Sequence, residues 1–229
     1  MGKRGAPLPA LLTGAALVAA LLFWPRRASA ATQIPFDQWD AYPLPSLDPL
    51  PIPDVGYMPT NADQNLRAFL RLIRVAEHNV RQADNGAAYG MFYGSVPFFD
   101  FSDHPVITGE RRGAPLSDAM CRAAGFSPGC VTTAAGAYQI IKPTWQRVRK
   151  AGAWGERLPD FGPASQDEAA RRLLIESRAL PLIEAGDIQG GIKRAAGLWA
   201  SLPGNTAGQR QLSEVAALSI FDDGLTAWG

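Results

Sequence analysis

The sequence predicts an α+β domain that is mostly helical and carries one small antiparallel β-hairpin. Residues 65–80 place apolar side chains at helical spacing, whereas residues 88–103 are rich in glycine and aromatics with a rough alternation typical of paired strands. At 229 residues and 47% apolar content, the chain is long enough to bury one sizeable core. We therefore expect one folded domain with accessory segments.

The first predicted helix begins near Asn61 or Asp63, either of which can cap it, and runs to about Arg81. One face of this helix follows a spacing of four, three, four and three residues. Its members are Leu66, Leu70, Ile73, Glu77 and Val80. Arginines occupy the opposite face at Arg67, Arg71 and Arg74.

Glu77 is a carboxylate at a position where the pattern calls for a hydrophobic residue. Burial disfavours the charged form of a carboxylate and raises its pKa, which a general acid requires near neutral pH. A glutamate at the boundary of a core, with no catalytic role, gives the same pattern. Glu77 is thus a candidate general acid.

Asp100 and Asp103 end the predicted hairpin, next to His104 and Pro105. They are candidates for a second catalytic carboxylate or for substrate contacts. Aspartates at such positions more commonly cap turns.

Cys121 and Cys130 bracket a short loop containing glycine and proline. In an exported chain, this spacing favours a disulfide over two free buried thiols.

The segment TTAAGAYQIIKPTW places small residues before Tyr138 and Gln139, and a proline at position 143 suited to the first turn of a helix. Tyr138 and Gln139 could hydrogen-bond sugar hydroxyl and acetamido groups. The same pair is also common in a turn that faces a core.

Three further helices are predicted, over Gln166–Ser177, from Asp187 to near Gly197, and over Gln209–Phe221. Ser165 and Glu168 have the spacing of a capping box for the first of them, and Pro181 marks a break after it.

Residues 1–30 contain a basic start, an apolar run from Leu8 to Trp24, and an Ala28-Ser29-Ala30 site. This order is typical of a signal peptide cleaved after Ala30, with an uncleaved membrane anchor as the alternative. Residues 31–59 hold seven prolines and four aspartates and predict an extended linker. The folded domain would then span residues 60–229 and work outside the cytoplasm, in the periplasm or beyond, free or anchored to the inner membrane.

The net charge is only +1, with two histidines and two cysteines in the whole chain. Such a charge leaves no electrostatic footprint for nucleic acid, and so few nitrogen and sulfur ligands argue against a zinc site. We expect no metal, no cofactor and no nucleic-acid partner, and contact with a membrane only through an uncleaved N-terminal segment.

Several segments together resemble the bacteriophage lambda-type endolysins, a family of lysozyme-like lytic transglycosylases. They are AFLRLIRVAEHN around Glu77, the AYGMFYGS and FFDFSDHP parts of the hairpin, AAGAYQIIKPTW, and the long run from DFGPASQDEAARR to GLWASLPG. The match runs from residue 65 to residue 204. The sequence departs from the family's pattern at His78, where a small residue is usual, and in its longer segment 108–132.

The resemblance implies a lysozyme-like fold with the hairpin flanking an active-site cleft. It places Glu77 on the catalytic glutamate, Tyr138 and Gln139 on a sugar-binding turn, and Asp100 and Asp103 on the hairpin that carries aspartates. The implied partner is the glycan strand of peptidoglycan, bound by a monomer.

The implied reaction breaks the β-1,4 bond between N-acetylmuramic acid and N-acetylglucosamine, with a 1,6-anhydro ring as the product and Glu77 as acid and then base. A hydrolase in which an aspartate activates water is the first alternative. A peptidoglycan-binding domain without turnover is the second, and a structural domain tethered to a membrane is the third. Because a pure binder gains nothing from a desolvated carboxyl group, Glu77 favours an enzyme.

Overall fold

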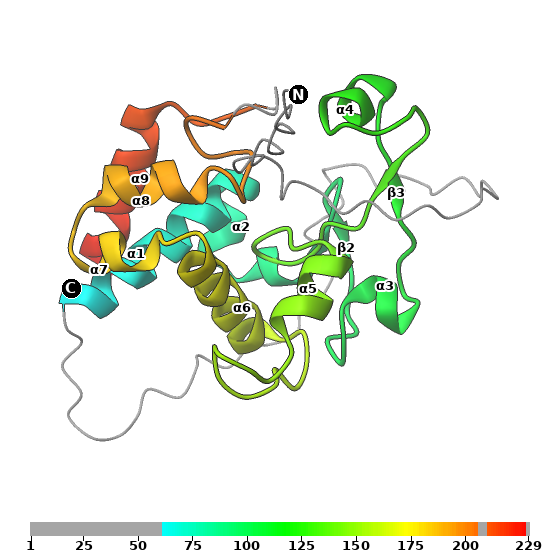
Figure 1. The fold of residues 1–229 in the computed structure, drawn as a ribbon, viewed down its shortest axis with the longest axis horizontal. Coiled ribbons are helices and arrows are strands. Elements are labelled where there is room, and N and C mark those ends of the chain that lie inside the picture. The colour runs from blue at the N-terminus through cyan, green and yellow to red at the C-terminus, as the bar shows by residue number, and fades with distance from the viewer. Residues whose placement is uncertain (1–60, 206–209, 228–229) are drawn as a thin grey trace, which may run out of the picture.

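The computed structural model describes residues 61–205 and 210–227, in which helices predominate and two short strand pairs lie to one side (Figure 1). The predicted α+β class is therefore confirmed. The predicted signal segment 1–30 and linker 31–59 lie outside the described residues. Within that described part, no helix is long and apolar enough to cross a membrane.

Helix α1 (Asn61–Glu77) is the central element, and α2, α7 and α9 pack against it (Figure 1). Its side chains at Ala68, Phe69, Leu72 and Ile73 are fully buried. The helix is surrounded because its apolar residues cover more than the single face that the spacing predicts. Burial of this kind supplies most of the stability of a helix, since intrinsic propensity alone is weak.

The predicted continuation of this helix to Arg81 is wrong, because α1 ends at Glu77 and a second helix, α2 (Val80–Asp84), follows. Asn79 is extended, with φ −155°, and its side chain accepts a hydrogen bond from the amide of Gln82. This cap starts a new helix. Val80 accordingly leaves the apolar face and is 51% exposed.

The expectation that the arginines of α1 lie opposite the core holds for Arg67, which is exposed, but not for Arg71 or Arg74. Arg71 is buried and donates to Asp84 at 2.7 and 2.9 Å. Arg74 donates to the Tyr138 hydroxyl at 2.8 Å. Both charges are buried because partners from other segments compensate for the lost water.

The predicted hairpin is present as β1 (Met91–Phe92) and β2 (Val96–Pro97), paired antiparallel with Phe92 opposite Val96. The 3-10 helix η2 (Ala87–Gly90) leads into it. Phe92 also bridges to Ala135, which joins the hairpin to a later turn.

A second antiparallel pair, β3 (Ala114–Pro115) with β4 (Val131–Thr132), was not predicted. Helices α3 (Pro105–Thr108) and α4 (Asp118–Ala123) lie before and after β3. The expected disulfide joins Cys121 to Cys130, with their Cα atoms 5.8 Å apart, and closes the loop between α4 and β4.

The remaining helices are α5 (Lys142–Val148), α6 (Pro163–Glu176), α7 (Leu180–Glu184), α8 (Ile188–Ala195) and α9 (Glu214–Ala227). Pro143 lies in the first turn of α5, and Asp187 caps α8 through the amide of Gly190, both as predicted. The predicted break is present between Glu176 and Leu180, and Pro181 lies in the first turn of α7. The final helix starts and ends several residues later than predicted, and Gln209 lies outside the described residues.

The predicted capping box at Ser165 and Glu168 does not form. Helix α6 begins three residues before Gln166, at Pro163, so Ser165 lies inside it. The Ser165 hydroxyl donates to Asp160 at 2.8 Å, and Glu168 pairs with Arg171 and Arg172. Asp160 also accepts from the amide of Gly162 at 2.9 Å, but Gly162 is the N-cap residue of α6 and no side chain among the described residues caps this helix.

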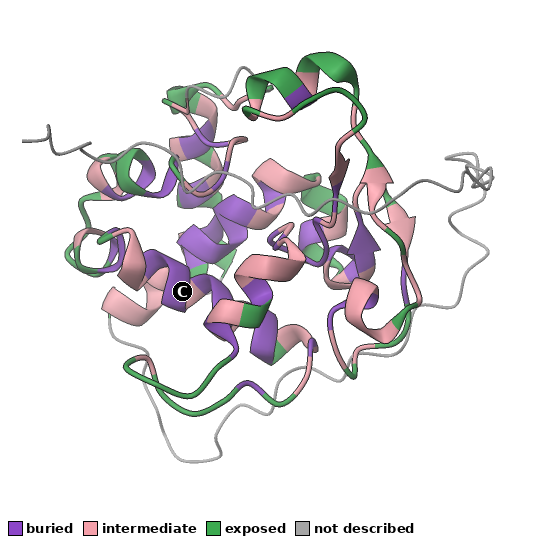
Figure 2. Ribbon diagram, turned by 45° about the vertical axis from the view of Figure 1, so that its right-hand side comes forward, coloured by how far each residue is buried: buried purple, intermediate pink, exposed green. Residues whose placement is uncertain are grey.

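The buried side chains form one core that runs through α1, α6, α5 and the end of the hairpin, whereas the α4 region is largely exposed (Figure 2). Trp145, Phe161 and Phe98 lie in this core with His104, which is fully buried. The ring of Phe161 meets Trp145 edge-on at 4.8 Å and packs 5.0 Å from His104. These contacts attach the hairpin side to the helices.

Candidate functional site

Glu77 lies at the last residue of α1, where the helix ends beside the segment that carries Ser201. Among the described residues, the only hydrogen bond to its carboxyl group comes from the Ser201 hydroxyl, which donates to Oε1 at 2.6 Å. Burial raises the pKa of Glu77 to about 7, and the bond from Ser201 partly opposes this rise. Glu77 can therefore hold a proton near neutral pH.

His78 follows Glu77, and its ring contacts the carbonyl of Gly136, which also accepts a hydrogen bond from Gln139. The oxygen of Gly136 lies 3.1 Å from His78 Nε2 and 3.1 Å from Gln139 Nε2. A carbonyl can only accept, so Nε2 of His78 carries the hydrogen and Nδ1 does not when the ring is neutral. Burial lowers the pKa of His78, which favours that neutral ring. This contact brings Glu77 and Gln139 to the same site.

The turn 135–140 depends on two residues with positive φ, Gly136 at 75° and Gln139 at 46°. The backbone closes on itself, because Ala135 and Ile140 exchange hydrogen bonds at 3.1 and 2.9 Å. Gln139 Nε2 also donates to the carbonyl of Met91 at 3.3 Å. Its side chain is therefore fixed between the turn and the hairpin.

Gln166, on α6, forms a hydrogen bond with the backbone of this turn. It is fully buried, accepts from the amide of Ala137 at 2.8 Å, and donates to the carbonyls of Tyr89 and Phe161 at 3.0 and 2.7 Å. A Cβ atom on Gly136 would lie 2.1 Å from Gln166 Oε1. Only glycine therefore leaves room for this amide beneath the turn.

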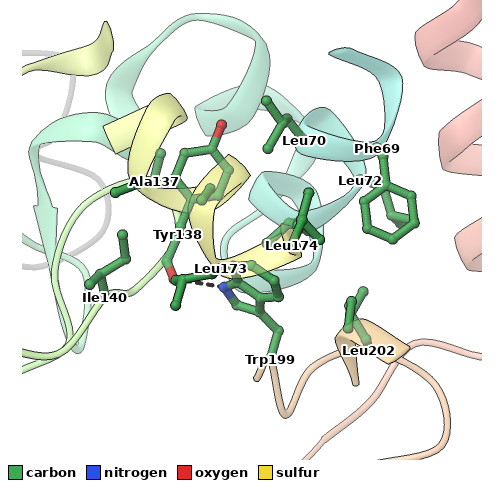
Figure 3. Close-up of a cluster of buried hydrophobic side chains, with 14 of the residues drawn as sticks. Phe69, Leu70, Leu72, Ala137, Tyr138, Ile140, Leu173, Leu174, Trp199 and Leu202 are labelled. Atoms are coloured by element: carbon green, nitrogen blue, oxygen red, sulfur yellow. Dashed lines mark hydrogen bonds between the residues drawn. The ribbon is translucent and has the colours of Figure 1, made fainter. Parts of the chain in front are cut away.

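Tyr138 is only 1% exposed, so its ring packs in the core and does not offer a surface to a ligand. Its hydroxyl donates to Asp167 at 2.5 Å and accepts from Arg74 at 2.8 Å. Its carbonyl accepts from Trp199 Nε1 at 3.0 Å, a bond that is drawn in Figure 3. Tyr138 thus attaches the turn to α1, α6 and the segment before Ser201.

Asp167 completes a buried polar cluster with Tyr138, Tyr89 and Arg74. The Tyr89 hydroxyl donates to Asp167 Oδ1 at 2.7 Å, and the guanidinium of Arg74 lies 5.8 Å from the Tyr89 ring centre. Burial raises the pKa of Asp167, although Arg74 and the two hydroxyl groups counteract it. All four side chains are already engaged with one another, so this cluster holds elements in place.

Asp100 is exposed, and its side chain forms hydrogen bonds within its own turn. Its Oδ1 accepts from the amide and the hydroxyl of Ser102 at 2.9 and 2.6 Å, and these bonds lower the pKa of Asp100. Its own amide donates to Glu110 at 2.9 Å. This is the turn-capping arrangement that the sequence left open, and it contains none of the residues around Glu77.

Asp103 is held between the hairpin and α5. Its carboxylate accepts from Trp145 Nε1 and from the amide of His104, both at 2.7 Å, and forms an ion pair with Arg149. Burial acts to raise the pKa of Asp103, but these donors lower it overall. The structure therefore brings Gln139 close to Glu77 and leaves Asp100 and Asp103 in separate contacts.

The residues described at 61–205 and 210–227 contain no group of three or more histidine, cysteine or carboxylate side chains able to hold a metal ion. His104 is buried, with Nε2 3.1 Å from the carbonyl of Ile140 and Nδ1 accepting from the amide of Val106. Burial lowers the pKa of His104 to about 4. It acts as a neutral part of the core.

Comparison with protein families gives a match over residues 67–223 to the family model described as Endolysin. The chain belongs to the Endolysin family. The matched range begins within α1 and ends within α9, so it contains Glu77, the turn 135–140 and Ser201.

Two endolysins from bacteriophages are similar to this chain over most of their length. The endolysin of Escherichia phage lambda is 34% identical over 161 residues, which are 69% of this chain and 89% of that protein. The endolysin of Escherichia phage P2 is 36% identical over 167 residues, covering 70% of this chain and 93% of the relative.

Solved structures of bacteriophage lambda lysozyme show the same fold. One, determined in complex with a chitohexasaccharide, superposes with a TM-score of 0.56 at 32% identity and covers 73% of this chain and 97% of that one. Another gives a TM-score of 0.52 at 31% identity, over 76% and 98%. The expected lysozyme-like fold is thus confirmed.

Sequence reasoning missed three residues that shape the site of this endolysin, namely Ser201, Gln166 and Asp167. Ser201 is 124 positions from Glu77, and no local pattern relates the two. Asp167 and Gln166 fell within a predicted helix and had no assigned role. A signal was available for Gln166 alone, because an uncharged amide between small residues on a buried helix must find partners.

Proposed function

We propose that this endolysin cleaves the β-1,4 bond between N-acetylmuramic acid and N-acetylglucosamine in peptidoglycan, with Glu77 as the general acid. The observation that carries the proposal is the Glu77 carboxyl group, half-buried at the end of α1, with a pKa of about 7 and a single hydrogen-bond partner among the described residues. The similar lambda lysozyme, solved with a chitohexasaccharide, supports a β-1,4-linked amino sugar as the substrate class.

In the proposed first step, protonated Glu77 gives its proton to the leaving glycosidic oxygen. The bond from Ser201 engages one carboxyl oxygen, Oε1, and leaves the other, Oε2, for the proton. As the C–O bond breaks, positive charge develops on the sugar, and the substrate's own 2-acetamido group would stabilise it. Gln139, fixed beside His78 through the Gly136 carbonyl, is the side chain we propose for contact with the sugar.

In the proposed second step, the ionised Glu77 removes a proton from the C6 hydroxyl of the same sugar as that oxygen attacks C1. The product is a 1,6-anhydro ring, and Glu77 regains its proton. The contacts of the aspartates favour this single-carboxyl route over hydrolysis. Asp103 forms an ion pair with Arg149, and Asp100 accepts hydrogen bonds within its own turn. Neither carboxylate is therefore placed to activate water.

The deciding experiment digests purified peptidoglycan and identifies the ends of the products by mass spectrometry. We expect 1,6-anhydromuramic ends, whereas reducing ends would indicate a hydrolytic lysozyme. Glu77→Gln should keep the fold and lose activity by about 100-fold or more, because an amide cannot deliver the proton.

Asp100→Asn is the matched control, since it also converts an acid to an amide but lies at an exposed turn. It should retain activity within a few-fold of the wild type. Near wild-type cleavage by folded Glu77→Gln would remove Glu77 from the mechanism and leave an aspartate-based hydrolase. Saccharide binding by a wild-type protein that cleaves nothing would instead support a binding domain.

We further propose that the enzyme acts outside the cytoplasm as a monomer, delivered by its N-terminal segment. The basic start, apolar run and Ala28-Ser29-Ala30 site in the sequence support the export of the chain. N-terminal sequencing of the protein recovered from cells should give Ala31 as the first residue. An intact N-terminus in the membrane fraction would indicate an anchor.

A further inference from the structure

A basic pocket of about 430 Å³ lies between α3 and the end of α5, separate from Glu77. Three of its lining residues are cationic, Arg149, Lys150 and Arg157, and the others are Ile107 and Gln146. None of the five forms a hydrogen bond with Glu77, His78 or Ser201 among the described residues. The reaction proposed above does not use this pocket.

Arg149 forms the buried side of the pocket and is incompletely satisfied. The residue is 9% exposed, one edge of its guanidinium donates to Asp103, and its centre lies 5.3 Å from the Trp145 ring. Its Nε is buried without a hydrogen-bond partner in the described part of the chain. A charged donor in this state costs free energy unless a partner approaches.

Arg172 fixes the backbone that carries the other two cations. This side chain is only 3% exposed and donates to the carbonyls of Val148, Lys150 and Glu156 at 2.8, 3.2 and 2.7 Å. The amide of Leu158 closes the loop by donating to the carbonyl of Arg149 at 2.8 Å. Hydrogen bonds therefore hold both ends of segment 149–158, and they fix the backbone that carries Lys150 and Arg157.

Lys150 and Arg157 are exposed, and neither belongs to an ion pair found within the described ranges. Asp103 compensates one of the three cations by pairing with Arg149, and gathering the three around one pocket is unfavourable for the isolated protein. An anion placed among them would relieve this repulsion. Guanidinium and ammonium groups together match the oxygen atoms of a carboxylate or a phosphate.

We propose that the basic pocket binds a carboxylate of the peptide stems that branch from peptidoglycan glycan strands. This inference rests on the proposed function, because the anion arrives with that substrate. Helix α5 begins two residues after Ile140 and ends at Val148, just before the pocket, and its seven residues span about 10 Å. A stem of three to five extended residues reaches roughly 10–18 Å, which is at least the length of α5 between the turn that carries Gln139 and the pocket.

The test compares binding to peptidoglycan that carries its stems with binding to glycan strands that an amidase has freed of their stems. All proteins carry Glu77→Gln, so that cleavage does not alter the substrate. The pocket variant is Lys150→Ala with Arg157→Ala, and the matched control is Lys193→Ala with Arg194→Ala, two exposed cations on α8. We expect the pocket variant to bind the peptidoglycan with stems about 5- to 20-fold more weakly and the stem-free glycan strands as well as the control does.

An equal loss on both substrates would overturn the inference, since the pocket would then respond to the glycan or to charge in general. So would an unchanged affinity, or a stem-independent affinity for which inorganic phosphate competes, which would indicate a phosphate-bearing polymer. Cleavage by the protein with native Glu77 is measured in parallel. If binding does not depend on the stems while cleavage is intact, only this inference fails. If cleavage is absent while binding depends on the stems, the proposed reaction fails.

Discussion

At the scale of single residues, the proton on Glu77 depends on two opposing influences. Burial against the end of α1 raises the pKa of the carboxyl group to about 7, and the hydroxyl of Ser201 lowers it by donating to Oε1. The same hydroxyl fixes the orientation of the carboxyl plane. Ser201 is therefore a positioning residue whose effects on acidity and on geometry can be measured separately.

Ser201→Ala should move the alkaline limb of the pH profile of kcat/KM to higher pH, because the donor that lowers the pKa of Glu77 is lost. Cleavage at neutral pH should fall several-fold, since the carboxyl group loses its fixed orientation. The measurement is the rate of peptidoglycan cleavage between pH 5 and pH 9.

Ser177→Ala serves as the control for that profile, because it removes a half-buried serine hydroxyl whose one bond within the described residues goes to the carbonyl of Leu174. Its profile should match the wild type. An alkaline limb of Ser201→Ala that stays in place, or moves to lower pH, would show that Ser201 does not tune Glu77.

At the scale of elements, the turn 135–140 holds the site together because hairpin, α6 and the segment before Ser201 all bond to its backbone. Gln166 accepts from the amide of Ala137, and Trp199 donates to the carbonyl of Tyr138. Gly136 is the most constrained residue of the turn, because its φ is 75° and Gln166 leaves no space for a Cβ atom.

Gly136→Ala should lower the free energy of unfolding by about 2–4 kcal/mol, which combines the cost of a left-handed alanine with the loss of buried hydrogen bonds. Cleavage should fall as well, since Gln139 and His78 both use the Gly136 carbonyl. Urea unfolding measures the first effect.

Gly125→Ala is the matched control, because Gly125 also has a positive φ, 79°, but has no atom within 4 Å of the added Cβ. It should cost only about 1–2 kcal/mol. Equal destabilisation by both substitutions would mean that the close approach of Gln166 carries no energetic weight.

Local patterns in the sequence predicted the elements whose causes are local. Asp187 and Pro143 start helices as expected, and Cys121 pairs with Cys130, because caps, rigid φ and short loops act over a few residues. The end of α1 at Glu77 was missed because the apolar period continues to Val80, whereas the side chain of Asn79 restarts the helix.

The features that escaped prediction depend on partners far away in the chain. The helical spacing predicted that Arg74 faces solvent. In the structure Arg74 contacts Tyr138 and Asp167, which are distant in sequence. Tyr138 and Gln139 were predicted to act together, but the positive φ at Gln139 turns the two side chains to different environments. The first is buried and the second stays partly exposed beside His78.

At the scale of the whole molecule, Glu77 and His104 give opposite dependences of stability on pH. The pKa of Glu77 is about 7 in the folded protein against 4.5 for an unperturbed glutamate, so its contribution to the free energy of unfolding falls as pH rises from about 4.5 to about 7. The pKa of His104 is about 4 against 6.5, so its contribution falls as pH drops through that interval. The two slopes largely offset each other in the wild type.

Glu77→Gln removes one of these slopes and should reveal the other. The variant should match the wild type near pH 4 and become more stable by about 3–4 kcal/mol above pH 7, since the two pKa values differ by about 2.5 and each unit corresponds to about 1.4 kcal/mol. Its stability should also decline more steeply than that of the wild type between pH 6.5 and pH 4. Urea unfolding at pH 4, 6 and 8 measures both effects. Asp100→Asn is the control, because hydrogen bonds from Ser102 lower the pKa of this exposed carboxylate, in the direction opposite to the pKa of Glu77. A difference between Glu77→Gln and wild type that stays the same at all three pH values would mean that Glu77 ionises as an ordinary glutamate, and its assignment as the proton donor would lose its physical basis.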